Sequence, residues 1–240
     1  MRWFDMPTAF GAAALTSAGT FQGAASACAN VDCVDTIDAY LERLASDAPV
    51  PGGGSAAAIV AALGAALVAM VGRLTFRAAK FIAFAPEAAE LVRRADVLRR
   101  GLDEARARDE RAFSSVVDAQ AMPKNTDVER SARTAALQLA LTEAADAPLH
   151  CAALAGDVIE LAQGIAAAGN TGLASDVGCA AEFGAAAVAA CAYNVRVNHR
   201  YMRDEASIER QKQALETIER DAAGRANAVR DLVNAALARA

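Results

Sequence analysis

Residues 51–72 read PGGGSAAAIVAALGAALVAMVG, and this stretch decides the fold. Residues 56–72 carry no polar side chain, so a helix over them is apolar on every side and must be buried in protein or in a membrane. The stretch is shorter than the roughly 20 residues of a membrane span, and alanine and glycine transfer weakly into lipid. We therefore predict a buried helix from about Ser55 to Ala79 at the centre of the protein, and no membrane association.

Hydrophobic residues recur at helical spacing in the rest of the sequence, and no stretch alternates as a β-strand does. Pro148 is expected to kink or split the helix that contains it. The sequence thus predicts an all-α bundle of about six to eight helices around the central Ala/Gly-rich apolar helix. Besides the central one, the predicted helices cover about residues 34–44, 86–121, 127–168, 176–201 and 208–236. The expected N-terminal caps are Asp32, Thr126 together with Glu129, and Ser175 or Asp176.

The composition describes a folded, acidic protein of one domain, or of one domain with an appendage. The chain has 240 residues, 55% of them hydrophobic, and a formal net charge of -5. Nucleic-acid binding requires clustered positive charge, whereas the arginines here are interleaved with Asp and Glu, so we predict no nucleic-acid partner. We assign residues 32–240 to a helical domain and residues 1–31 to an N-terminal extension of unknown role. The extension matches a secretory signal only weakly, because Asp5 and Pro7 interrupt its apolar segment.

The cysteines and histidines favour a reduced, cytoplasmic location and no bound metal. The cysteines are odd in number and widely spaced, and three of them lie in apolar runs where a thiol behaves as a small hydrophobic residue. His150 and His199 lack the neighbouring ligands of a zinc site. The five cysteines are Cys28, Cys33, Cys151, Cys179 and Cys191.

Asp109 is the most informative single residue of the sequence. The apolar stripe of the 86–121 segment contains Leu102, Ala105, Phe113 and Val116. Helical spacing places the Asp109 carboxylate on the same inward face, where burial penalises its charged form. A buried carboxylate with a raised pKa would suit general acid–base chemistry. The alternative is that Asp109 lies at the edge of the stripe and pairs with Arg106 or Arg108.

The turn formed by Gly52, Gly53, Gly54 and Ser55 opens the central helix. Three glycines let backbone N–H groups approach a ligand closely, and the helix dipole favours an anion or a developing negative charge there. The GKS or GKT ending of a P-loop is absent. The alternative is an ordinary helix cap with a flexible turn.

Further polar residues give weaker signals. Asn194 and Asn198 are four residues apart on an apolar helix, so their amides share one face and could hold one ligand or could join two helices. Asn170 and the pair Ser175–Asp176 bracket a short loop and have a capping explanation. Lys124 lies alone in a loop, where a lysine is usually solvated.

Taken in order, several strings of this sequence resemble the formimidoyltetrahydrofolate cyclodeaminase and methenyltetrahydrofolate cyclohydrolase family over residues from about 33 to 238. The resemblance rests on APVPGGGSAAAIVAALGAALVAMVGRLT (48–75), DERAF (109–113), MPKNT (122–126), GNTGLASD (169–176) and NVRVN (194–198). It implies an all-helical homodimer that binds a reduced folate in a cleft, without a metal or a redox cofactor. Asp109 is then the expected proton-transfer residue. The residues expected to line the pocket or the dimer cleft are Gly52, Gly53, Gly54, Ser55, Lys124, Asn170, Ser175, Asp176, Asn194 and Asn198.

The resemblance leaves three functions open. A chain without a fused formiminotransferase domain favours the cyclohydrolase, which converts 5,10-methenyltetrahydrofolate to 10-formyltetrahydrofolate. The alternative is the cyclodeaminase, which forms the methenyl compound from the formimino compound with release of ammonia. The family's lysine-rich GKKKY-like segment is replaced here by residues 76–81, FRAAKF, and this departure motivates a second alternative: a ligand-binding dimer with an altered substrate or without catalysis.

Overall fold

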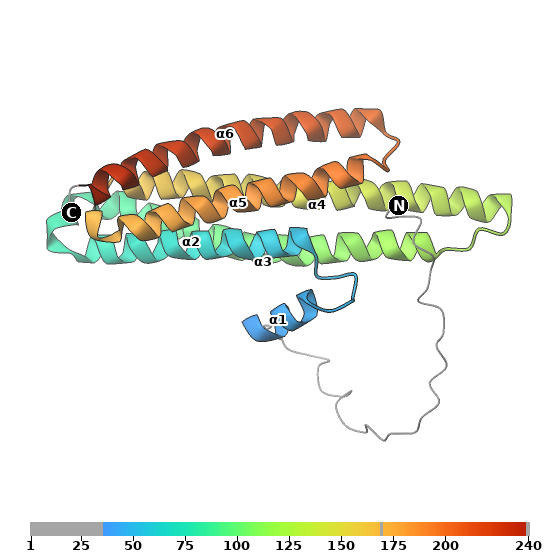
Figure 1. The fold of residues 1–240 in the computed structure, drawn as a ribbon, viewed down its shortest axis with the longest axis horizontal. Helices are drawn as coiled ribbons and strands as arrows, with labels where there is room; N and C mark the ends of the chain where they lie inside the picture. The colour runs from blue at the N-terminus through green and yellow to red at the C-terminus, as the bar shows by residue number, and fades with distance from the viewer. Residues whose placement is uncertain (1–35, 169, 239–240) are drawn as a thin grey trace, which may run out of the picture. The chain divides into compact units, whose positions relative to one another are not determined.

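The computed structural model describes residues 36–168 and 170–238, and within them the backbone forms six α-helices, two short 3₁₀ helices and no β-strand (Figure 1). This confirms the all-α prediction. The helices are α1 (Ile37–Leu44), α2 (Gly53–Arg77), α3 (Ala85–Ala121), α4 (Asp127–Ala166), α5 (Ala174–His199) and α6 (Glu205–Leu237), with 3₁₀ helices at Ala79–Phe84 and Thr171–Leu173.

The chain divides into two units, residues 1–40 and residues 41–240. Helix α1 crosses this boundary and begins after Thr36, whose hydroxyl oxygen accepts a hydrogen bond of 3.1 Å from the Ala39 N–H. The predicted cap Asp32 and the predicted extension 1–31 lie outside the described residues.

Helices α2 to α6 pack side by side (Figure 1). Helix α2 packs mainly against α3 and α5, and also contacts α4, while α6 packs on α4 and α5. The shared core is built largely from alanine and valine, because residues such as Ala58, Ala61, Ala65 and Val68 of α2 are fully buried. The prediction of a central apolar helix is therefore confirmed.

Small residues set the spacing of the central helices. A Cβ atom on Gly64 of α2 would lie 2.9 Å from the backbone oxygen of Ala180 in α5. That separation is shorter than any normal contact, so only glycine lets these two helices come so close. Close backbone approach explains why the run of Ala and Gly packs as a core rather than as a loose surface helix.

The capping box predicted at the start of α4 is confirmed. The Glu129 N–H donates to the Thr126 hydroxyl at 3.2 Å, and the Thr126 N–H donates to the Glu129 carboxylate at 2.9 Å. Another local prediction is wrong. Helix α5 begins at Ala174, after the 3₁₀ helix, so Ser175 and Asp176 lie inside it and do not cap it. Of the two outcomes expected at Pro148, a split does not occur, because α4 continues through this buried residue as one helix.

Three stretches of the described chain are long and apolar enough to cross a membrane, by length and composition alone: Gly53–Arg77, Asp127–Ala166 and Thr171–His199. Their most apolar windows are 56%, 50% and 39% buried inside the protein. A large part of this apolar surface is therefore used for packing between helices. Exposed apolar side chains remain on all three helices, among them Leu63 of α2, Leu139 of α4 and Tyr193 of α5.

Candidate active site

Asp109 lies on α3 against the first turn of α2. A Cβ atom on Gly54 would lie 2.2 Å from the Asp109 Oδ1 atom, so the carboxylate occupies the space that any other residue at position 54 would fill. The backbone N–H of Ser55 donates a hydrogen bond to this carboxylate. The N–H groups of a first helical turn have no partner within their own helix, and the carboxylate of the neighbouring helix supplies one here.

Burial raises the pKa of Asp109 to about 6, with the negative charge of Glu110 acting in the same direction and the Ser55 N–H acting against both. The arginines that the sequence offered as partners are bound elsewhere. Arg106 pairs with Asp103 and Glu110, and Arg108 pairs with Glu143 at 2.7 Å. Asp109 can therefore exist in both protonation states near neutral pH, as a group that exchanges protons must.

Ser55 contacts both Asp109 and a second carboxylate, that of Glu110, which was not predicted from the sequence. The side chain of Ser55 is fully buried, and its hydroxyl donates to the Glu110 Oε1 atom at 2.8 Å. Arg106 donates to the same oxygen at 3.0 Å, and the Arg43 guanidinium lies 3.8 Å from the other oxygen of Glu110. The only available signal was that Glu110 follows Asp109 in the DERAF string.

A pair of buried thiols lies on the other helices, and one of them, Cys191, is close enough to Asp109 to feel its charge. Cys151 of α4 and Cys191 of α5 are buried and free. A hydrogen bond with Cys151, burial and the nearby charge of Asp109 raise the pKa of Cys191. A buried thiol is a weakly polar group, so Cys191 adds to the weakly polar surroundings that disfavour the charge of Asp109.

The two asparagines of α5 have different places. Asn194 lies at the first turn of α2, because its Nδ2 atom is 3.3 Å from the position of a Cβ on Gly53. Its amide donates to the Ala190 oxygen at 2.9 Å. Asn198 instead donates to the backbone oxygens of Ala144 in α4 and of Asn194, both at 2.8 Å. Asn194 thus borders the Asp109 site, whereas Asn198 joins α5 to α4.

Replacing Asn198 by alanine is expected to lower stability and leave the kinetics essentially unchanged. Losing a half-buried amide that bonds to another helix costs about 1–3 kcal/mol, since the Ala144 oxygen then lacks this donor. Thermal unfolding and steady-state kinetics of the variant check this. A raised KM at unchanged stability would instead show that this amide binds the substrate.

The other predicted residues lie away from Asp109 within one chain. Asn170 donates to the Thr75 hydroxyl at 3.0 Å, near the carboxyl end of α2, which is about 30 Å along the helix from Gly54 at 1.5 Å per residue. Ser175 and Asp176, in the first turn of α5, are also at that end. Lys124 is exposed in the loop after α3, and its backbone oxygen accepts a 3.2 Å hydrogen bond from Arg130. One chain therefore brings together the glycine turn, Ser55, Asp109 and Asn194, but not these residues.

The segment that replaces the family's lysine-rich stretch is also at the carboxyl end of α2. Lys80 lies in the 3₁₀ helix Ala79–Phe84, with its ammonium 4.8 Å from the centre of the Phe81 ring. The contact is a cation–π pair within the segment.

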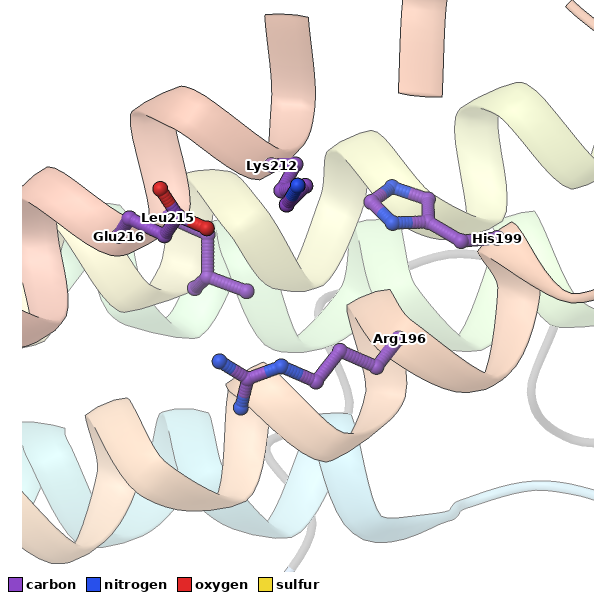
Figure 2. A pocket seen from close by; sticks show the side chains of 5 residues that line it. All are labelled: Arg196, His199, Lys212, Leu215 and Glu216. Carbon is purple, nitrogen blue, oxygen red and sulfur yellow. The ribbon is translucent and has the colours of Figure 1, made fainter. Parts of the chain in front are cut away.

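A separate pocket of about 210 Å³ lies between α5 and α6 (Figure 2). Its lining residues are Arg196, His199, Lys212, Leu215 and Glu216. His199 is fixed by the buried Gln211, whose Oε1 atom is 2.8 Å from the ring nitrogen and whose amide donates to Asp146 at 2.7 Å. This pocket contains none of the predicted site residues. Among the described residues, no three His, Cys, Asp or Glu side chains are grouped so that they could hold a metal ion.

The helical bundle places the Asp109 carboxylate of α3, with a pKa raised to about 6, against the amino end of the central helix α2, an arrangement suited to acid–base chemistry. The sequence model of the formiminotransferase-cyclodeaminase family matches residues 36–217. This protein belongs to that family of folate one-carbon enzymes.

Individual relatives agree with this assignment. The methenyltetrahydrofolate cyclohydrolase of Methylorubrum extorquens is 42% identical over 182 residues, which cover 76% of this chain and 88% of that protein. The formimidoyltransferase-cyclodeaminase of Rattus norvegicus is 32% identical over 78% of this chain, but the match spans only 35% of that longer protein. The crystal structure of formiminotetrahydrofolate cyclodeaminase from Thermotoga maritima has the same fold, with a TM-score of 0.78 and 26% identity over 85% of this chain and 98% of that one.

Proposed function

We propose that this protein hydrolyses 5,10-methenyltetrahydrofolate to 10-formyltetrahydrofolate. The observation that carries the proposal is the Asp109 carboxylate, held by the Ser55 N–H at the amino end of α2 with a pKa raised to about 6. The 42% identity with a methenyltetrahydrofolate cyclohydrolase supports this reaction. Formiminotetrahydrofolate cyclodeaminase activity is the second candidate, because the matching crystal structure carries that name.

The hydrolysis requires one group that takes up a proton and later returns it. Water adds to the cationic methenyl carbon between N5 and N10, and the Asp109 carboxylate accepts the proton that this water loses. The bond between that carbon and N5 then breaks, and N5 receives the proton from Asp109. The added hydroxyl group loses its remaining proton to the regenerated carboxylate, which passes it to solvent, and the carbon remains on N10 as a formyl group. A carboxyl group that titrates near pH 6 can do both steps.

The same group would serve the cyclodeaminase reaction. There N10 attacks the formimino carbon on N5, and ammonia leaves after protonation. Both reactions pass protons at one carbon, so the Asp109 geometry alone supports either. The neutral hydrogen-bonding groups of the glycine turn and Asn194 would orient the folate in both cases.

We also propose that two copies associate through the exposed apolar face of α2 and α5. Leu63, Met70 and Leu74 recur at helical spacing on α2 and are 49%, 36% and 45% exposed. Tyr193 and Val197, one turn apart on the adjacent α5, are 73% and 45% exposed. A second copy that covered this face would remove these apolar side chains from water.

A two-fold dimer with antiparallel α2 helices would also unite the predicted binding residues. It would bring the carboxyl end of α2 in one copy toward the amino end of α2 in the other. Asn170, Ser175 and Asp176 of one copy would then approach Asp109 of its partner. In this dimer, residues that lie far apart within one chain would line the same folate-binding cleft.

Replacing Leu63 by arginine is expected to convert the dimer into a monomer, because the buried charge would have no partner at the centre of the contact. Size-exclusion chromatography with light scattering measures the change as a halved mass. Leu139→Arg is the matched control, since Leu139 is 75% exposed on α4, outside the proposed contact, and its dimer should persist. A monomeric native protein would contradict the proposed interface.

The test of the function is a spectrophotometric assay of the purified native protein. With 5,10-methenyltetrahydrofolate, we expect enzyme-dependent loss of the near-ultraviolet band of the methenyl group. Formation of that band from 5-formiminotetrahydrofolate, with ammonia release, would instead show the cyclodeaminase. Folate binding without turnover in either assay would identify a non-catalytic folate-binding dimer and refute both enzyme assignments.

A further inference from the structure

We propose that Glu110 is a positioning residue of this site, which holds the Ser55 hydroxyl and thereby keeps the Ser55 N–H directed at the Asp109 carboxylate. The kinetic part of this inference rests on the proposed function, whereas its structural part does not. Glu110 does not touch the reacting atoms in this scheme. It acts through the first turn of α2.

The first turn of α2 has few anchors of its own. Gly52 is the N-cap and has no side chain, so no side-chain cap hydrogen bond exists there. Gly53 and Gly54 follow, and a run of glycines loses more conformational entropy on ordering than other residues do. Ser55 is the first residue of α2 with a side chain, and it is therefore the first place where a neighbouring helix can hold this turn.

Ser55 makes two contacts with successive residues of α3. Its N–H donates to Asp109, and its hydroxyl donates to Glu110 at 2.8 Å. The Glu110 carboxylate is itself fixed by Arg106 at 3.0 Å, one helical turn earlier on α3. Because Ser55 is fully buried, its hydroxyl could not replace the Glu110 contact with bulk water. Glu110 thus anchors the first turn of α2 against α3, and with this turn the Ser55 N–H.

The charge of Glu110 also acts on Asp109. The titratable groups that interact with Asp109 are Glu110 on its own helix and Cys191 on α5, and Cys191 is hydrogen-bonded to Cys151 of α4. Helix α2 faces Asp109 with Gly54 and Ser55. The negative charge of Glu110 disfavours ionisation of Asp109 and raises its pKa. Removing this charge should lower the pKa of Asp109, and hydrolysis by the ionised carboxylate should then persist to lower pH.

Two substitutions at position 110 distinguish the effect of the hydrogen bond with Ser55 from the effect of the negative charge of Glu110. Glu110→Gln keeps an oxygen that can accept the Ser55 hydroxyl but removes the charge, whereas Glu110→Ala removes both. Glu143→Gln is the matched control, because Glu143 also pairs with an arginine of α3 at 2.7 Å but is not among the groups near Asp109. We would measure kcat, KM and the pH dependence of kcat for the three variants and the native protein.

We expect Glu110→Ala to lower kcat about tenfold or more with a smaller change in KM, because the displaced N–H no longer orients Asp109. Glu110→Gln should keep most of kcat and move the acid limb of the pH profile about half a unit lower. Glu143→Gln should match the native protein. Native kcat and pH profile in both Glu110 variants, or a raised KM with unchanged kcat, would overturn the proposal.

A second measurement remains valid if the protein shows no turnover. The carboxyl ¹³C resonance of Asp109, assigned by its absence in Asp109→Asn, reports the titration of this group directly. A lower Asp109 pKa in Glu110→Gln, and an altered Asp109 environment in Glu110→Ala, support the inference independently of the substrate. Unchanged titration in both variants refutes it, whereas failure of the folate assays alone refutes only the proposed function.

Discussion

Replacing Asp109 by asparagine is expected to lower turnover about 100-fold or more, the usual contribution of a positioned proton-transfer group. Asparagine has nearly the same shape and can still accept the Ser55 N–H hydrogen bond through its oxygen. It cannot take the proton from water or return it to N5. The loss should therefore appear in kcat, with KM little changed.

The same substitution should not destabilise the protein at neutral pH. The pKa of Asp109 is raised from 3.8 to about 6 in the folded state, so the folded protein holds this proton more tightly than the unfolded chain does. Stability therefore falls as pH rises through the interval between these values, when the half-buried carboxyl group becomes charged. Asparagine removes that penalty, which is about 1–3 kcal/mol for a shift of this size.

Thermal unfolding at pH 5 and pH 8, together with the folate assay, checks both effects of Asp109→Asn. At pH 8 we expect the melting temperature of the variant to equal or exceed that of the native protein. At pH 5 the difference in melting temperature in favour of the variant should be smaller. Native turnover in the variant would remove Asp109 from the mechanism. A large loss of melting temperature at pH 8 would show that Asp109 is needed for folding instead.

Replacing Gly54 by alanine is expected to inactivate the enzyme almost as strongly as the loss of Asp109. The added Cβ would lie 2.2 Å from Oδ1 and 2.6 Å from Cγ of Asp109, so the carboxylate must turn away from the Ser55 N–H. A displacement of about 1 Å in a catalytic group can cost about 100-fold in rate. The forced rearrangement should also cost about 1–3 kcal/mol of stability.

Gly52→Ala is the matched comparison for this prediction, since nothing lies within 4 Å of a Cβ at position 52. We expect a much smaller loss of activity from it, although both substitutions add one methyl group to the same turn. Kinetics and melting temperatures of the two variants measure the difference. Equal losses of activity in Gly52→Ala and Gly54→Ala would show that activity depends on the flexibility of the turn rather than on the space that Asp109 occupies.

The helical fold could be predicted from the sequence because the patterns that indicate helices and caps involve residues close together along the chain. The apolar run of residues 56–72 predicted the central helix, and the Thr126–Glu129 pair predicted a cap that the structure confirms. One local rule was wrong, since the 3₁₀ helix Thr171–Leu173 takes the place where Ser175 or Asp176 was expected to cap α5. Local rules also left two outcomes open at Pro148, and the structure excludes the split, because α4 continues through this residue.

Only part of the candidate site could be predicted from the sequence. Asp109 could be found because helical spacing alone places a carboxylate on an apolar stripe, and burial then raises its pKa. Glu110 could not be found in this way, since its partner Ser55 is 55 residues away in the sequence. The role of Asn198 likewise depends on a carbonyl group of another helix, 54 residues away.

By itself, the sequence determined that this protein is a helical bundle with an apolar centre and one carboxylate among the apolar side chains, because helical periodicity and capping depend on residues a few positions apart. Only the tertiary structure decided which groups surround that carboxylate. The antiparallel packing of α2 on α3 places the Gly54–Ser55 turn against Asp109 and Glu110. The other predicted residues lie away from this turn, namely Asn170, Ser175, Asp176 and Lys124. The pKa of Asp109 follows from that packing, since burial and neighbouring charge act through space and not along the chain.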